Sequence, residues 1–118
     1  MTEQATFHVR DADGVPAIDI RGEVDISNCD QFRSFLKTAG GQASPAIVVS
    51  LENVSYLDSH ALAALVDFSK RLATNRRRLV LVAGRLTPAG KILGISNLGL
   101  AIPVCDSVDE ALTKARNG

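Results

Sequence analysis

Two short apolar runs constrain what this chain can fold into more than any other feature. Ala46–Leu51 and Leu79–Val82 consist almost wholly of Val, Ile, Leu and Ala, without the regular polar alternation of a strand that faces solvent. Such runs are typical of central strands covered on both faces. Between them, Leu and Val recur at helical spacing from Asp58 or Ser59 onward. A strand, a helix and a second strand in this order predict a parallel sheet.

The residues before this unit predict an antiparallel hairpin and a helix. Thr6–Arg10 and Val15–Arg21 have strand character, and the Asp-Gly turn between them suits a tight hairpin. Gly22–Asp25 is expected to be a loop. Apolar side chains then recur every three or four residues from Ile26 to about Thr38, which predicts a helix that the two following glycines end.

The residues after the second buried strand predict two further helices and one strand. Pro88 suits the first turn of a helix whose left-handed end would be supplied by Asn97 or Gly99. Residues 101–104 are expected to form a last short strand. Asp106 or Ser107 would cap a terminal helix.

Composition agrees with one domain and excludes several classes of protein. The chain has 118 residues, 46% of them hydrophobic, which suffices for one core. We therefore predict a single α/β domain over residues 1–118, a mixed sheet with an N-terminal antiparallel hairpin, a parallel core and about four flanking helices. Zero formal net charge argues against a nucleic-acid binder that depends on phosphate contacts. No apolar run is long enough to span a membrane and residues 1–4 start no secretory signal, so we expect a cytoplasmic protein without a membrane partner.

Motifs of catalysis and cofactor binding are missing from the sequence. It contains no zinc-protease helix motif, no dinucleotide-binding glycine motif after a strand and no nucleophile elbow. Gly84 and Gly90-Lys91 fail both the spacing of a phosphate-binding loop and its following Ser or Thr. Cys29 and Cys105 are most simply small buried hydrophobes, although they would form a redox pair if their Cα atoms lay within about 7 Å. We expect no enzymatic activity, no metal and no cofactor.

Charge is distributed unevenly along the chain. Residues 1–69 carry ten acidic and four basic side chains, whereas residues 70–118 carry three acidic and nine basic ones. Two interpretations are open: long-range pairing within the fold cancels the difference, or a polarised surface orients a charged partner. The basic group at residues 70–78 also has two interpretations: a solvated helix C-terminus, whose dipole cations complement, or a dedicated site for an anion or a partner.

The segment with the most suggestive chemistry is the start of the helix at Asp58 and Ser59. It follows a buried strand and a short polar connector at residues 52–57. Asp58 suits the N-cap position, where its carboxylate accepts hydrogen bonds from free N–H groups, and Ser59 then presents a surface hydroxyl. A phosphate on Ser59 would meet the positive end of the helix but lie beside the Asp58 carboxylate. Asp-Ser is also ordinary capping chemistry, so a purely structural role is the alternative.

Three motifs resemble those of a known family. Gly22–Asp25 resembles a Gly-Glu-aliphatic-Asp loop, and residues 53–62 resemble a segment that ends in Asp-Ser-Ser/Thr-Gly-Leu. Leu86–Ala89, with Asn97-Leu98 downstream, resembles a later helix led by Pro. In this order they are similar to the STAS-domain proteins of the bacterial anti-sigma factor antagonist family.

This resemblance implies partner switching rather than catalysis. Members of the family bind an anti-sigma factor that is a serine kinase, and thereby free the sigma factor. The kinase phosphorylates the Ser that follows Asp, here Ser59, which ends binding until a metal-dependent serine phosphatase removes the phosphate. The partner-binding residues that the resemblance implies are Gly22, Glu23, Asp25, Asp58, Ser59, His60 and Ala61. The alternative is a STAS subunit of a transport or stress-signalling complex, in which Asp58 and Ser59 dock without phosphorylation.

Two residues depart from the family's pattern. His60 stands where the family usually has Ser or Thr, and Ala61 stands where it usually has Gly. The imidazole would either clash with a kinase active site or, when protonated, stabilise phosphoserine. Ala61 is expected to restrict the backbone and to thicken the surface that presses on the partner.

The predicted phase of the helix after Ser59 can be tested at Leu65. Leu65→Ala is expected to lower the free energy of unfolding by about 2–5 kcal/mol, because it deletes buried methyl groups and leaves a cavity. Partner choice should not change in the folded fraction. Thermal unfolding measures the effect, and an unchanged midpoint would mean that another side of the helix faces the core.

Overall fold

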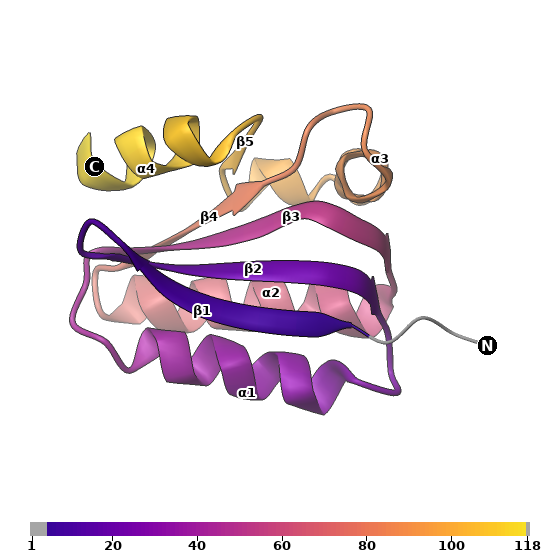
Figure 1. Cartoon of the computed structure of the whole chain (residues 1–118), viewed down its shortest axis with the longest axis horizontal. Coiled ribbons are helices and arrows are strands. Elements are labelled where there is room, and N and C mark those ends of the chain that lie inside the picture. Colours follow the sequence, from indigo (N-terminus) through magenta and orange to yellow (C-terminus); the bar gives the residue numbers. More distant parts are fainter. Residues whose placement is uncertain (1–4, 118) are drawn as a thin grey trace.

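The computed structural model describes residues 5–117, which form a five-stranded mixed sheet with four α-helices (Figure 1). The order of the strands in the sheet is β1-β2-β3-β4-β5. β1 and β2 pair antiparallel, and all other neighbours pair parallel, as the sequence predicts. The elements are β1 (Thr6–Ala12), β2 (Val15–Val24), α1 (Cys29–Gly40), β3 (Ala46–Leu57), α2 (Ser59–Thr74), β4 (Arg78–Val82), α3 (Pro88–Ser96), the 3₁₀ turn η1 (Leu98–Leu100), β5 (Val104–Cys105) and α4 (Val108–Asn117).

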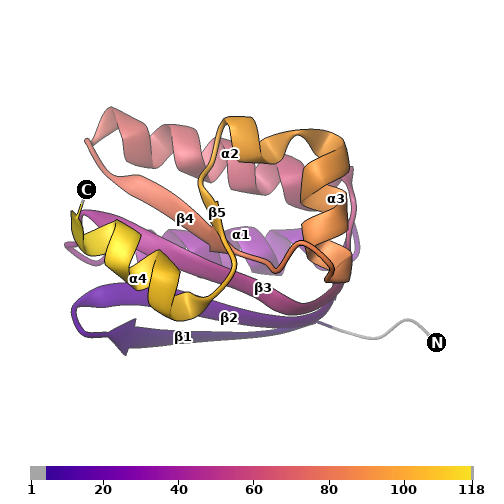
Figure 2. The same cartoon turned by 90° about the horizontal axis from the view of Figure 1, so that it is seen from above.

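The helices form unequal layers on the two faces of the sheet. α1 and α2 cover one face, whereas α4 covers part of the other and α3 packs against β3 near its C-terminal end (Figures 1 and 2). Successive residues of a strand serve different layers, so Val49 lies in the core under α1 and α2 while Val48 lies in the smaller core under α4. Cys29 and Cys105 are free thiols buried in these two different cores, so the structure contains no disulfide between them.

β2 and β3 are both longer than the sequence indicates. β2 continues to Val24 and β3 to Leu57, so the predictions of a loop that starts at residue 22 and of a connector over residues 52–57 are wrong. The two strands stay paired as far as Val24 opposite Leu57, with two register irregularities. Backbone hydrogen bonds between distant segments override the polar local sequence here. Gly22, at the second irregularity, has φ +95°, which glycine adopts without the penalty of a Cβ.

α1 and β5 are shorter than predicted. α1 begins at Cys29, because residues 25–28 form a hydrogen-bonded turn and Ile26, expected on the buried face of the helix, is 70% exposed. β5 has only two residues, since the chain before it forms η1 and a turn.

The predicted helix ends are confirmed at four positions. Asp58 is the N-cap of α2, and Pro88 is the first residue of α3. Asn97 ends α3 with a left-handed φ of +59°. The Ser107 hydroxyl accepts a hydrogen bond of 3.1 Å from the backbone N–H of Glu110 and so caps α4.

α2 turns a slightly different face to the core than the spacing of its leucines suggests. Leu65 and Leu72 are buried as predicted, whereas Leu62 and Val66 are only half-buried. The remaining buried positions are Ala61, Ala64 and Phe68.

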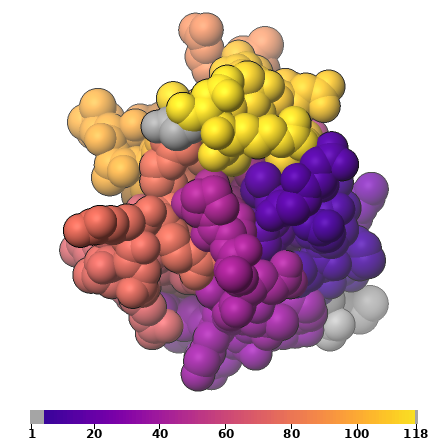
Figure 3. Space-filling model, turned by 90° about the vertical axis from the view of Figure 1, so that its left-hand side faces the viewer, coloured from indigo at the N-terminus to yellow at the C-terminus, as the bar shows by residue number. Residues whose placement is uncertain are grey.

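Part of the basic group at residues 70–78 stabilises the ends of other helices. Arg77 donates three hydrogen bonds of 2.6–2.7 Å to backbone carbonyls at the end of α1 and just beyond it. Arg78 donates two to carbonyls of α4. Figure 3 shows these segments gathered at one end of the molecule. These two cations therefore complement helix C-termini, though those of α1 and α4 rather than that of α2.

A tight turn makes Gly90 indispensable at the start of α3. The Gly84 carbonyl accepts hydrogen bonds from the N–H and the hydroxyl of Thr87, and that hydroxyl in turn accepts one from the N–H of Gly90. A Cβ on Gly90 would overlap the Gly84 carbonyl oxygen. A Cβ on Gly94, one turn further along the same helix, would meet no atom within 4 Å.

Gly90→Ala and Gly94→Ala are therefore expected to have opposite effects. Gly90→Ala should lower the free energy of unfolding by about 1–3 kcal/mol, because the added methyl group forces the turn apart. Gly94→Ala should raise it by up to about 1 kcal/mol, because alanine favours the helix. Urea unfolding of both variants measures the difference, and equal midpoints would contradict the geometry of this turn.

Candidate functional site

The pairing of β2 with β3 brings two polar segments together at one end of the sheet. Val24 and Leu57 are opposite each other at the ends of the two strands, and the N–H of Asp58 donates a hydrogen bond of 3.1 Å to the Val24 carbonyl. The chain then enters α1 from β2 and α2 from β3 at this same end (Figure 1). The predicted site residues at 22–25 and 58–61 are therefore neighbours in space.

Asp58 joins these two segments through its carboxylate. One oxygen, Oδ1, accepts a hydrogen bond of 3.0 Å from the N–H of Ala61 and so caps α2. The other, Oδ2, accepts one of 3.0 Å from the N–H of Ile26, in the turn before α1. Both oxygens are thus engaged, and the carboxylate has a fixed orientation.

The pKa of Asp58 is lowered by these contacts. Burial of the carboxylate by itself raises the pKa, but the hydrogen bonds from Ala61, His60 and Ile26 favour the charged form and outweigh burial. His60 contributes through its ring, whose Nδ1 lies 3.3 Å from Oδ2. Asp58 is therefore a fixed negative charge at neutral pH.

Asp25 shapes the turn before α1. Its Oδ1 accepts a hydrogen bond of 2.9 Å from the N–H of Ser27 and a further one from the Ser27 hydroxyl. Asn28 closes the turn from the other side, since its side chain accepts from the N–H of Asp25 at 3.0 Å and donates to the Glu23 carbonyl at 2.8 Å. The sequence analysis missed Asn28, although an Asx residue three positions after Asp25 is a recognisable turn signal.

Ser59 is the first residue of α2, and its side chain is exposed. Among the residues that the structure describes, none forms a hydrogen bond with its hydroxyl. His60, 54% exposed, stands beside it with its ring turned toward Asp58. The site thus presents a free hydroxyl, a fixed carboxylate and an imidazole at a helix N-terminus.

Two predicted partner-binding residues are buried and act through the backbone instead. The side chain of Ala61 lies in the core, so the expectation that its methyl group thickens the partner-facing surface is wrong. Its N–H group is what the site uses, in the bond to Asp58. Gly22 is likewise buried, and its contribution is the unusual backbone conformation at the end of β2.

Ile26 is an exposed apolar side chain that the sequence analysis placed in the core. Its N–H is bound to Asp58, while its side chain is 70% exposed beside the cap. Helical spacing suggested a buried position, but the local turn of residues 25–28 delays the start of α1, and the bond to Asp58, 32 residues away, holds Ile26 outside the helix. Beneath the site, the thiol of Cys29 donates to the His60 carbonyl at 3.4 Å.

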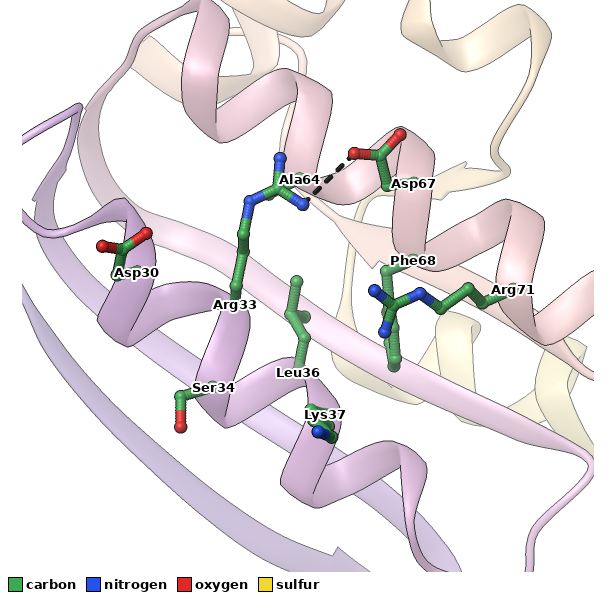
Figure 4. Close-up of a pocket in the computed structure, with 9 residues that line it drawn as sticks. All are labelled: Asp30, Arg33, Ser34, Leu36, Lys37, Ala64, Asp67, Phe68 and Arg71. Atoms are coloured by element: carbon green, nitrogen blue, oxygen red, sulfur yellow. Dashed lines mark hydrogen bonds and ion pairs between the residues drawn. The ribbon is translucent and has the colours of Figure 1, made fainter.

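A hollow lies between α1 and α2 (Figure 4), and Ser59 is not among the residues that line it. Its volume is about 270 Å³, and Leu36, Ala64 and Phe68 lie beneath it. An ion pair of 3.2 Å between Arg33 and Asp67 joins the two helices across it. Arg33 and Asp67, two of the charged side chains that line this hollow, pair with each other, so it is most simply a helix–helix seam.

Within residues 5–117, no group of three or more His, Cys, Asp or Glu side chains is placed to hold a metal ion. In the same part of the chain, no helix has the length and apolar character needed to cross a membrane.

Residues 6–111 match the family model of the STAS domain, and the chain belongs to this family. Its fold is shared by an anti-sigma factor antagonist from Mycobacterium paratuberculosis, with a TM-score of 0.87 and 24% sequence identity over 98% of this chain and 99% of that one. The anti-sigma factor antagonist SpoIIAA in its unphosphorylated form aligns with a TM-score of 0.76 and 23% identity, over 96% and 98% of the two chains. The phosphorylated form of the Bacillus SpoIIAA aligns with a TM-score of 0.66 and 22% identity, over 92% and 98%.

Variants of Asp58 test the clamp between the two segments. Asp58→Ala is expected to lower the free energy of unfolding by about 1–2 kcal/mol at pH 7, because the N–H groups of Ala61 and Ile26 lose their acceptor. Asp58→Asn keeps an acceptor but removes the charge, so its loss should be smaller. Urea unfolding of wild type, Asp58→Asn and Asp58→Ala should show the free energy of unfolding falling in that order.

The lowered pKa of Asp58 also predicts a dependence on pH. A carboxylate whose pKa is lower in the folded chain adds stability above its unfolded pKa of about 3.9, and this stability is lost as the pH falls through the folded value. The difference between wild type and Asp58→Asn should therefore be full at neutral pH and vanish in acid. A difference that stays constant below pH 4 would show that charge plays no part.

Proposed function

We propose that this protein is an anti-sigma factor antagonist that binds an anti-sigma factor of the serine-kinase type and is switched off by phosphorylation of Ser59. The observation that carries the proposal is the free, exposed hydroxyl of Ser59 at the first position of α2, directly after the Asp58 cap, in a chain of the STAS family. The names of its structural neighbours support the role, and one of them is described in a phosphorylated form. A serine phosphatase would restore binding. In this proposal the protein acts in the cytoplasm by binding, not by catalysis.

The geometry around Ser59 explains how one phosphate would dissociate a complex. Phosphorylation adds about −1.5 to −2 charge. Both oxygens of Asp58 are held by hydrogen bonds, so its carboxylate cannot turn away to relieve the repulsion. A hundredfold loss of affinity needs about 2.8 kcal/mol, which buried like charges in a protein contact readily supply.

The partner would contact side chains from both segments. Ile26 offers an exposed apolar anchor, and Ser59 and His60 offer polar groups beside it. Gly22, Glu23, Asp25, Asp58 and Ala61 would shape this surface mainly through the turn and the cap that hold it in place. The proposed interface is thus a small apolar centre with a phosphorylatable rim.

One observation favours a second candidate function. The ring of His60 stands beside Ser59 where the family pattern has a small hydroxyl residue, so a kinase would have to accommodate an imidazole next to its target hydroxyl. If no kinase does so, the protein would be a STAS subunit of a transport or stress-signalling assembly, and the same surface would dock without phosphorylation.

The two functions differ in what Ser59 does. Purified protein would be incubated with a kinase-type anti-sigma factor of the same organism, magnesium and ATP, with phosphorylation followed by mass spectrometry and affinity by calorimetry. We expect phosphate on Ser59 only, and a loss of affinity of at least about a hundredfold in Ser59→Glu. Ser59→Ala should remain bound and unmodified.

Ser34→Glu is the matched control. Ser34 is an exposed serine in the middle of α1, so its substitution introduces the same charge away from Ser59. It should bind like wild type. His60→Ser should speed phosphorylation if the ring hinders the kinase. Binding that is the same for wild type and Ser59→Glu, with no phosphate on Ser59, would reject the switch and favour the second function.

A further inference from the structure

Three large aliphatic side chains around α3 are almost fully exposed. Leu86, Ile95 and Leu100 are 86%, 85% and 89% exposed, although the core beside them is well packed. Single exposed leucines are ordinary, but several within one short segment of the chain indicate an interaction surface.

A groove runs along one side of α3, and Leu100 lines it, whereas Ile95 lies outside its lining. Its volume is about 410 Å³, and its floor and walls are formed by Leu93 and Gly94 of α3 together with Leu100 and Val104. A second hollow, bounded by Leu86, continues it, since both are lined by Arg85 and Asp106. The two hollows therefore meet at Arg85 and Asp106, with Leu86 on one side of this junction and Leu100 on the other.

The absence of side chains at the glycines keeps this groove open. A Cβ on Gly94 would meet no atom within 4 Å, and one on Gly99 would only touch Val104. Another chain can consequently approach the backbone of α3 closely.

The charge around the groove indicates what approaches. Residues 84–105 contain two basic side chains, Arg85 and Lys91, and no acidic one. Neither forms an ion pair with any described residue. Asp106 is the one acidic side chain that lines the groove within residues 5–117. An occupant with acidic groups beside an apolar face complements this surface.

Other occupants fit these observations less well. In a symmetric contact, a second copy would bring only one groove-lining carboxylate, that of Asp106, to the two unpaired bases. An anionic membrane attracts a protein through clusters of about 4–8 basic residues, more than the two found here. A small molecule in the groove would leave Leu86 and Ile95 uncovered.

We propose that this α3 groove docks an amphipathic helix of a partner protein, with acidic residues flanking its apolar face. The groove shares no residue with the site around Ser59, so this is a second docking surface that goes beyond the proposed function. Its aliphatic residues would take up the apolar face of the helix, and Arg85 and Lys91 would pair with its flanks.

A pair of designed peptides tests this proposal. Both are helical, about 18 residues long, and have the same leucine pattern, but Glu flanks the leucines in one and Lys in the other. Each is titrated into the isotope-labelled full chain, and backbone amide shifts are followed by NMR. We expect saturable shifts at Gly94, Gly99, Leu100 and Val104 with the Glu peptide, and at least about tenfold weaker binding of the Lys peptide.

Variants separate the groove from the rest of the surface. Gly94→Leu fills the groove and should lower the affinity for the Glu peptide by at least about tenfold. Arg85→Glu should lower it by a similar factor. Gly94→Ala, which adds only a methyl group in open space, shows whether the helix tolerates substitution there. Lys70→Glu, an equal charge change on α2, should have no effect. Ser59→Glu should also bind the peptide unchanged, which distinguishes this surface from the phosphorylation switch.

Four results would overturn the proposal. The first two are an absence of saturable shifts and an equal affinity for both peptides. The third is binding of the chain to vesicles of phosphatidylcholine and phosphatidylglycerol, if Gly94→Leu abolishes it. The fourth is self-association of the chain, if Gly94→Leu abolishes it. The last two would assign the groove to a membrane or to a second copy of this chain.

Discussion

The parallel pairing of β2 with β3 is the interaction on which the rest of this structure depends. It continues to the last residue of each strand, where Val24 lies opposite Leu57, and the N–H of Asp58 extends it by one more hydrogen bond. Because both strands end at the same level, the two helices that follow them start side by side. A β2 that ended at Arg21, as its local sequence suggests, would leave the residues around Asp25 remote from Ser59.

Asp58 converts this alignment into a defined surface. Its two oxygens hold the first turn of α2 and the turn before α1, so one side chain sets the relative position of both segments. The same hydrogen bonds lower its pKa and keep it charged. The hydrogen bonds that fix the structure at Asp58 therefore also set its charge. The side chain of the adjacent Ser59 is exposed, and its hydroxyl forms no hydrogen bond with any described residue.

The short β4 accounts for the other unusual surface. β4 ends at Val82 whereas its neighbour β3 runs on to Leu57, and α3 packs beside the uncovered part of β3. The chain reaches that position through the tight turn at Gly84 and Thr87, for which Gly90 must lack a side chain. The buried side of α3 completes the main core, and its other sides, with their glycines and exposed aliphatics, are left to solvent. In the proposed complex, a docking partner would cover the exposed aliphatic side chains around α3.

The sequence alone determined the features that depend on neighbouring residues. Apolar runs and helical spacing predicted the order of the strands and helices. Capping preferences located Asp58, and they narrowed two further helix ends to a pair of residues each, one of which, Asn97 or Ser107, is the cap. Tertiary structure decided the rest. It lengthened β2 and β3 through hydrogen bonds between distant segments, exposed Ile26, buried Ala61 and used Arg77 at the end of another helix. The pairing of β2 with β3, the Asp58 contact of Ile26 and the contacts of Arg77 all join residues more than 25 positions apart, and a local pattern carries no information about a contact that forms only when the chain has folded.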